Sequence, residues 1–184
     1  DQFEIYLFSL ARGAEDSYRQ RLRKAADHFV EVDALTDKGV AEKSRELGID
    51  IAIDLMGFTT HNRHGVFMAR CAPVQVTWIG MPSTSGSPAI DYIIADKIVI
   101  PEQNRQFYSE KVINLPCYWP NDSTKKISDK AICRAEFDLP ETGFVFCCFN
   151  TIYKILPETF AGWLRILAAT PNSVLWLLGS NEEA

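Results

Sequence analysis

Residues 72–96 read APVQVTWIGMPSTSGSPAIDYIIAD, in which two apolar runs flank a loop of small residues that begins at Gly80 and ends at Gly86. The runs at 74–79 and 89–95 are typical of buried strands. The two glycines permit conformations and close approaches that a Cβ would block, and the serines and threonine between them bring hydroxyls and unpaired amides. Such a loop can hold a ligand, although composition alone favours an ordinary connection between strands.

Outward from this stretch, strand and helix patterns alternate along the chain. Apolar runs rich in aromatic and β-branched residues predict strands, and charged stretches with capping residues predict helices. The expected strands cover 3–10, 28–32, 49–56, 74–79, 89–95, 112–115, 144–149 and 174–178, and the expected helices cover 15–24, 36–47, 63–70, 125–138 and a segment opened by Pro157. This alternation predicts an α/β fold with a Rossmann-like parallel sheet and flanking helices on both faces.

Polar residues follow two neighbouring strands of this expected sheet. Thr59 and His61 come soon after the strand at 49–56, and Gly80 directly follows the strand at 74–79. Ligands of parallel α/β sheets bind at the carboxyl ends of the strands, so we expect Thr59 and Gly80 at one edge of the same sheet. A histidine in a polar loop is more often simply solvated, and that alternative stays open for His61.

Composition and charge argue against several classes of function. The chain of 184 residues has a net charge of −5 and no dense stripe of Lys or Arg, so neither nucleic acid nor a membrane is an expected partner. It has no apolar run of bilayer length and no signal-peptide pattern, which predicts a soluble cytoplasmic protein. No acidic pair or His/Cys cluster has the spacing of a metal site, so no metal or other cofactor is expected.

The cysteines predict neither zinc binding nor disulfide bonds. There are five of them and no CxxC spacing. Cys147 and Cys148 lie inside the apolar run 144–149, where a cysteine behaves as a small hydrophobe, so we expect both to be buried in a strand. Free buried thiols fit a reducing compartment.

Several separate motifs resemble those of one family, in the same order. They are WIGMPSTSG with DYIIAD, YSEKVINLP, FNTIYKILPETF and PNSVLWLL. Together they resemble the catalytic region of the nucleocytoplasmic O-linked N-acetylglucosaminyltransferases, especially their bacterial relatives. The resemblance implies a two-lobed GT-B glycosyltransferase, with residues 1–120 as the later part of the first lobe and 121–184 as a linker, helix and opening βαβ unit of the donor-binding lobe. It also implies that tandem helical repeats and the rest of the catalytic region belong to the parent chain.

The function implied by the resemblance is inverting transfer of N-acetylglucosamine from UDP-GlcNAc to Ser or Thr hydroxyls of proteins. The implied partners are the nucleotide-sugar donor and a protein acceptor, and the chain alone is expected to be inactive. Similar plant enzymes transfer fucose, so another donor such as GDP-fucose stays open, as does a non-catalytic α/β module. A Rossmann dehydrogenase fits poorly because no GxGxxG motif follows a strand.

The resemblance also implies site residues. In the family, the lysine of the FNxxYK motif contacts the donor diphosphate and is needed for transfer, and Lys154 occupies that place. Position alone fits a solvated surface lysine, although the helix opened by Pro157 would add partial positive charge beside it. Gly80 and Pro82 match positions that lie against the donor sugar and phosphates, and Thr59 matches a threonine near the reacting centre.

The FNxxYK motif contributes three further donor-binding candidates, Asn150, Thr151 and Tyr153. Tyr153 is either a core residue or a supporting one. Thr151 departs from the glutamine of animal members, a difference that bears on any contact needing a side-chain amide. Met81 and Ser83 likewise replace Tyr and Gly, which matters only where side chains select the sugar.

No general base stands out in the sequence. Asp54 lies at a strand end, and Asp91 and Asp96 bracket an apolar strand. Few carboxylates in any fold are catalytic, so we expect these three to be capping or structural groups.

Overall fold

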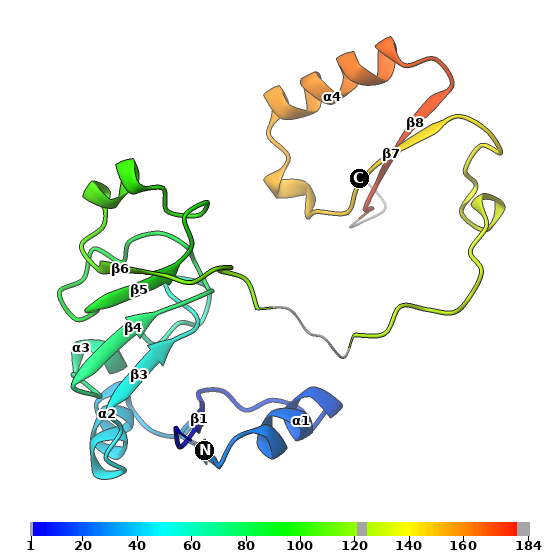
Figure 1. The fold of residues 1–184 in the computed structure, drawn as a ribbon. Helices are drawn as coiled ribbons and strands as arrows, with labels where there is room; N and C mark the ends of the chain where they lie inside the picture. Colours follow the sequence, from blue (N-terminus) through cyan, green and yellow to red (C-terminus); the bar gives the residue numbers. More distant parts are fainter. Residues whose placement is uncertain (1, 121–124, 180–184) are drawn as a thin grey trace. The chain divides into compact units, whose positions relative to one another are not determined.

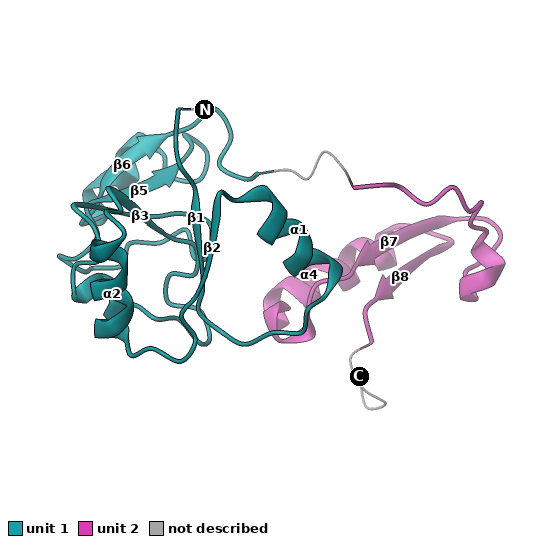
Figure 2. Ribbon diagram, turned by 90° about the horizontal axis from the view of Figure 1, so that it is seen from below, with its two compact units in different colours: residues 1–123 teal, residues 124–184 magenta. Residues whose placement is uncertain are grey.

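The computed structural model describes residues 2–120 and 125–179 (Figure 1). The chain divides into two compact units, Asp1–Ser123 and Thr124–Ala184, which are described separately (Figure 2). The expected lobe boundary between 120 and 121 adjoins residues 121–124, which lie outside the described residues. Every strand pair in the described parts is parallel, which confirms the α/β fold class.

Unit 1 alternates strands with helices. Its elements are β1 (Tyr6–Ser9), α1 (Ser17–Ala25), β2 (His28–Glu31), α2 (Asp37–Glu46), β3 (Ile51–Asp54), α3 (Gly65–Met68), β4 (Val74–Thr77), β5 (Tyr92–Ala95), the 3-10 helix η1 (Glu102–Phe107) and β6 (Lys111–Asn114). The strands form a two-stranded sheet, β1–β2, and a four-stranded sheet in the order β3–β4–β5–β6. The parallel sheet that the sequence predicted is thus divided between β2 and β3 into two sheets. Packing joins the two sheets instead, because Val30 and Ala52 lie against the same core cluster.

Helix α2 follows the expected pattern and supplies much of this core. The Thr36 hydroxyl accepts a hydrogen bond from the Gly39 amide at 3.2 Å, and Gly48 just past the helix has φ 70°. These are the start and stop signals that the sequence predicted. Val40 and Ala41 on this helix are buried in a cluster with Val32, Val66 and Cys71.

A buried glutamine ties three segments of unit 1 together. The side chain of Gln75 on β4 is 0% exposed. Its Oε1 accepts a hydrogen bond from the Cys71 amide at 2.8 Å, and its Nε2 donates to the carbonyls of Phe67 at 3.0 Å and Ala89 at 2.5 Å. Buried backbone groups need hydrogen-bond partners, and these three groups find none in a β-ladder. The Gln75 side chain supplies their partners and so connects the segments to one another.

Replacing Gln75 with leucine is expected to lower the free energy of unfolding of this chain by about 2–4 kcal/mol, because several buried polar groups lose their partners together. Urea denaturation followed by circular dichroism measures the change. The exposed Gln103 provides the matched control, and Gln103→Leu should change stability by less than about 0.5 kcal/mol. Equal stability of the two variants would contradict this role for Gln75.

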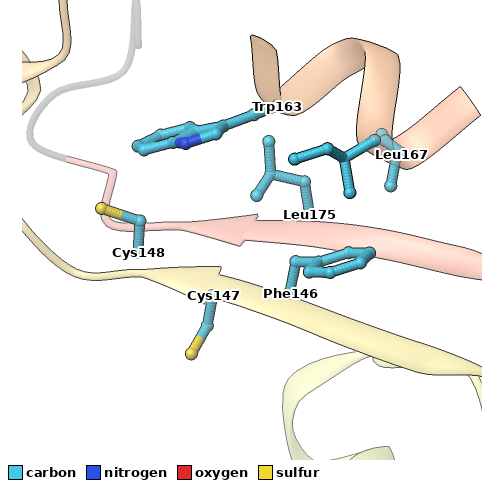
Figure 3. Close-up of a pocket in the computed structure, with 7 residues that line it drawn as sticks. Phe146, Cys147, Cys148, Trp163, Leu167 and Leu175 are labelled. Atoms are coloured by element: carbon cyan, nitrogen blue, oxygen red, sulfur yellow. The ribbon is translucent and has the colours of Figure 1, made fainter. Parts of the chain in front are cut away.

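Unit 2 contains one βαβ unit. Its elements are η2 (Arg134–Phe137), β7 (Phe144–Cys148), η3 (Ile152–Lys154), α4 (Pro157–Ala169) and β8 (Ser173–Leu177). Strands β7 and β8 pair in parallel, and α4 covers one face of the pair. Between them lies an apolar groove of about 230 Å³, into which Trp163 and Leu167 point from the helix and Phe146 and Leu175 from the strands (Figure 3).

The prediction that β7 and its cysteines are buried was wrong. No residue in the range 125–179 is fully buried, and Cys147 is exposed while Cys148 is partly exposed. Neighbouring residues of a strand point to opposite faces of a sheet. Cys148 therefore lies on the side of α4, whereas Cys147 points to the uncovered face (Figure 3).

The helix expected at 125–138 is also absent, apart from the single turn of η2. Helices in proteins gain most of their stability from packing an apolar face. Here Ile127 is 91% exposed and Ile132 is 64% exposed, so the segment has nothing to pack against. Cys133 then starts η2 through a reciprocal cap with Glu136, and Asp138 ends it in the left-handed conformation.

Candidate functional site

The carboxyl end of β3 turns into a compact polar loop. The buried Asp54 carboxylate accepts hydrogen bonds from the amides of Met56 at 2.9 Å and Gly57 at 3.2 Å, which bends the chain at the end of the strand. The Thr59 hydroxyl then donates to the Met56 carbonyl at 3.0 Å. Thr59 is thereby held half-buried at the sheet edge.

The loop after β4 lies directly against this first loop. Strands β3 and β4 pair in parallel, with Asp54 opposite Thr77, so both loops leave the same edge. A Cβ built on Gly80 would lie 2.2 Å from the Met56 carbonyl oxygen, the same atom that the Thr59 hydroxyl contacts. The prediction that Thr59 and Gly80 share one edge of one parallel sheet is confirmed.

The residue before Gly80 is conformationally strained. Ile79 has φ 69°, and the Gly80 amide donates to the Trp78 carbonyl at 3.1 Å, which closes a γ-turn around Ile79. A positive φ is a genuine outlier for a β-branched residue, and such strain is found mostly at functional sites. The Tyr118 hydroxyl donates to the Ile79 carbonyl and holds the turn in place.

Further along, the YSEK motif fixes the loop at two more points. The Tyr108 hydroxyl donates to the Pro82 carbonyl at 3.1 Å. Glu110, only 4% exposed, accepts hydrogen bonds from the Thr84 hydroxyl and the Ser85 amide, both at 2.7 Å. Although burial raises the pKa of Glu110, the hydrogen bonds from Ser85 and Thr84 bring it below its usual value.

Reasoning from the residues missed Tyr108, Glu110 and Tyr118. Their partners lie 25 to 39 positions away along the chain, so no local spacing reveals them. One feature of the sequence could have indicated Glu110. It is an acidic residue directly before a short apolar strand, where its carboxylate can be buried.

The tip of the loop remains open for a ligand. Met81, Pro82 and Ser83 are exposed. Within the described residues, the amides of Met81, Ser83 and Thr84 have no hydrogen-bond partner. Unpaired amides in a tight loop are suited to bind anionic oxygens.

The three carboxylates considered in the sequence are structural, as predicted; Asp54 ends β3 and Asp96 follows β5 at this edge, whereas Asp91 precedes β5 at the opposite edge of the sheet. Besides Asp54, Asp91 pairs with Arg70 at 2.7 Å and accepts from the Gln75 amide at 2.8 Å. The Asp96 carboxylate accepts from the amides of Val99 and Tyr118, which hold the pKa of Asp96 below its usual value. A carboxylate occupied by backbone donors is a poor general base at neutral pH.

The loop histidines play different roles. His61 is exposed, with φ 62°, and has no hydrogen bond within the described part of the chain. His64 packs its ring against Phe58, with the centroids 4.9 Å apart. His61 stays a candidate without further support from the geometry.

Unit 2 carries the remaining candidates on the segment between β7 and α4. Asn150, Thr151, Tyr153 and Lys154 are all exposed, and Tyr153 at 80% exposure is not a core residue of this unit. The Lys154 amide donates to the Thr151 carbonyl at 3.0 Å in the turn of η3. Lys154 forms no ion pair among the described residues, so its ammonium is available to an anion.

Helix α4 begins close to this lysine. Pro157 stands in its first turn, and its N-cap residue, Leu156, makes no side-chain capping hydrogen bond. Within the described residues the amides of Glu158 and Thr159 have no partner either. A helix start with free amides attracts negative charge, in the same direction as the lysine.

Metal-ligand clusters and membrane-spanning helices are both absent from the described residues. The part of the chain that the structure describes contains no group of three or more His, Cys, Asp or Glu side chains arranged to hold a metal ion. None of its helices combines the length and apolar character that crossing a bilayer requires.

Parallel α/β units with polar loops at the carboxyl ends of their strands are typical of proteins that bind nucleotides or other phosphate-bearing ligands. Comparison with known families narrows this class. The model of glycosyl transferase family 41 matches residues 1–127 and 121–182. The chain belongs to glycosyl transferase family 41.

Named relatives agree with this membership. The chain is 38% identical over 184 residues to the probable UDP-N-acetylglucosamine–peptide N-acetylglucosaminyltransferase SEC of Arabidopsis thaliana, covering 97% of this chain and 19% of that protein. It is 23% identical over 288 residues to a Caenorhabditis elegans protein named as the same transferase, covering 95% of this chain and 25% of the relative. The chain thus spans a small part of the length of these relatives.

A solved structure has the same fold. It is a mutant of the Thermobaculum terrenum O-GlcNAc transferase, with a TM-score of 0.84 and 33% sequence identity. The match covers 95% of this chain and 32% of that one.

Proposed function

We propose that this chain is part of the catalytic region of an inverting glycosyltransferase that transfers N-acetylglucosamine from UDP-GlcNAc to Ser or Thr hydroxyls of proteins. The names of its relatives support the donor and the peptide acceptor. The observation that carries the assignment to this site is the contact of two strand-end loops at the Met56 carbonyl, beside an exposed tip with unpaired amides. The free thiols of all five cysteines are compatible with a cytoplasmic location.

Each group has a defined role in this reaction. A general base supplied by the parent chain takes the proton of the acceptor hydroxyl, and the hydroxyl oxygen bonds to the anomeric carbon from the face opposite the diphosphate. The C–O bond to the diphosphate breaks at the same time, and its electron pair leaves with the diphosphate. Lys154 and the start of α4 stabilise the charge that grows on this leaving group. The main chain from Gly80 to Pro82 supports the sugar and phosphates, and Thr59 lies near the reacting centre.

The side chains of the FNxxYK motif take supporting roles. Asn150, Thr151 and Tyr153 are exposed next to Lys154 and are available to the donor. No metal is required in this scheme, because a fixed cation and amides supply the positive charge. The rest of the nucleotide pocket and the general base come from the parent chain.

A donor screen on the complete parent enzyme tests the function. Hydrolysis and transfer are measured with UDP-GlcNAc, UDP-glucose and GDP-fucose, using a Ser/Thr-containing protein as acceptor. We expect turnover with UDP-GlcNAc alone. Turnover with GDP-fucose alone would establish the alternative donor, and absence of turnover with every donor would favour the non-catalytic module.

The chain on its own is expected to bind the donor nucleotide more weakly than about 1 mM, equivalent to less than about 4 kcal/mol of binding free energy. The physical reason is that the residues that would surround the nucleoside lie elsewhere in the parent chain. Titration calorimetry with UDP measures the affinity, with the parent enzyme as the control. Micromolar binding by this chain would show that it already contains a complete nucleotide pocket.

A further inference from the structure

A buried carboxylate lies beneath the loop that follows β4. Glu110 directly precedes β6 and is 4% exposed. Its Oε2 accepts from the Thr84 hydroxyl at 2.7 Å, and its Oε1 accepts from both the Ser85 amide and the Ser85 hydroxyl. Among the described residues it has no ion-pair partner, so hydroxyls and backbone amides stabilise its charge.

The hydrogen bonds continue from these two hydroxyls into the backbone. Thr84 Oγ1 accepts from the amides of Gly86 at 3.1 Å and Ser109 at 3.2 Å, and Ser85 Oγ accepts from the Ser87 amide at 3.2 Å. An ionised carboxylate can only accept, so it orients both hydroxyl protons toward itself. The hydroxyl oxygens are then free to hold these amides, and one buried side chain fixes the backbone from 84 to 87.

Burying a charge is unfavourable unless hydrogen bonds to the charged form compensate for the lost water. Here the hydrogen bonds from Thr84 and Ser85 do so, since they hold the pKa of Glu110 below its usual value. The same hydrogen bonds fix the geometry of the loop. The Thr84 and Ser85 hydroxyl protons are directed to Glu110, so these hydroxyls cannot donate to a ligand. The groups of this loop that can donate to a ligand are the exposed main-chain amides of Met81 and Ser83.

We propose that Glu110 is a positioning residue for the donor: it holds the base of the loop so that the unpaired amides at the tip face the ligand. That the ligand is a sugar nucleotide rests on the proposed function. The claim that Glu110 holds the loop does not rest on the proposed function, because this claim can be tested without measuring turnover.

The first measurement is hydrogen exchange by mass spectrometry on the parent protein carrying Glu110→Ala or Glu110→Gln. Amides 85–87 should exchange at least about tenfold faster in Glu110→Ala, the change expected on losing hydrogen bonds to a charged group. Glu110→Gln should have a smaller effect, since it keeps one acceptor oxygen for Ser85. The matched control is Glu42→Gln, which changes an exposed glutamate on α2 and should leave the loop unchanged.

The second measurement is the kinetics of donor turnover by the same variants. Glu110→Ala should raise the donor KM by about tenfold and lower kcat by less than about threefold, because the loop binds the donor in ground and transition states alike. A merely structural role would instead reduce the fraction of active enzyme and leave KM unchanged. The Gln variant should partly restore KM, and it replaces the Ala variant if the latter does not fold.

The outcomes distinguish failure of the positioning role of Glu110 from failure of the proposed transferase function. Unchanged exchange at 85–87 in a folded Glu110 variant overturns the positioning role, as does a normal KM with only a smaller active fraction. If the wild-type parent turns over no sugar nucleotide, the proposed function fails, and the exchange measurement still decides whether Glu110 holds the loop.

Discussion

Replacing Lys154 with methionine in the complete parent enzyme is expected to lower turnover by roughly a hundred- to a thousand-fold, while donor binding weakens far less. The structure supplies the physical reason. The Lys154 ammonium is exposed, has no ion pair among the described residues, and lies just before the uncapped start of α4. A cation placed in this way is best matched to charge that appears on the diphosphate as the bond breaks.

The size of this effect follows from electrostatics. Removing one preorganised donor from a developing anion in a water-poor site costs about 2.7 to 4 kcal/mol. Arginine should restore activity poorly, because its planar fork does not replace a compact ammonium between a strand end and a helix start. Lys126→Met, at another exposed lysine of unit 2, is the matched control and should keep normal turnover.

Steady-state kinetics with varied donor concentration decide this point. Near-normal kcat with only a raised KM in Lys154→Met would reduce Lys154 to a binding residue. If Lys126→Met lost as much kcat as Lys154→Met, unit 2 would tolerate no change in charge. The specific role of Lys154 in stabilising the leaving diphosphate would then be contradicted.

The Gly80→Ala substitution is expected to abolish most activity of the parent enzyme and to lower the free energy of unfolding by about 1–3 kcal/mol or more. The added Cβ would lie 2.2 Å from the Met56 carbonyl oxygen and 2.3 Å from its carbon. Both are backbone atoms of the loop that follows β3, so the two loops must separate. A displacement of about 1 Å at a reacting site can reduce rates by about a hundredfold.

Gly86 provides a control within the same loop. It has φ 62°, and no atom lies within 4 Å of the place that an added Cβ would take, so Gly86→Ala adds backbone strain without a clash. That variant should lose about 1 kcal/mol of stability and keep most activity. Thermal unfolding and donor kinetics on both variants test the difference, and a Gly80→Ala enzyme that equals wild type would show that the loop contact is not needed.

The sequence was sufficient to predict most of the elements and the edge at which the candidate residues lie. Local signals were decisive there, as with Thr36 and Gly48 around α2. The resemblance alone pointed to Lys154 and its motif, because an exposed lysine has no distinguishing pattern. Which residues bind the donor stays a prediction.

What the sequence could not predict depends on contacts between distant segments. Glu110 and Ser85 are 25 positions apart and meet only once β6 has paired with β5. The helix expected at 125–138 does not form because its apolar residues have no surface to pack against. Cys147 is exposed because α4 covers only one face of β7. Whether an apolar residue is buried depends on which other segments pack against it, and the local sequence does not contain that information.

The shared contact at Met56 has a consequence for how this site can change. The Thr59 hydroxyl and the Gly80 backbone meet the same carbonyl oxygen, so neither loop can shift without disturbing the partner of the other. Substitutions at residues that share a partner are energetically coupled and do not add. If the two loops bind the donor as proposed, we expect that changing donor selectivity needs paired changes in both loops, and that a library varying only one of them yields fewer active sequences than one varying both.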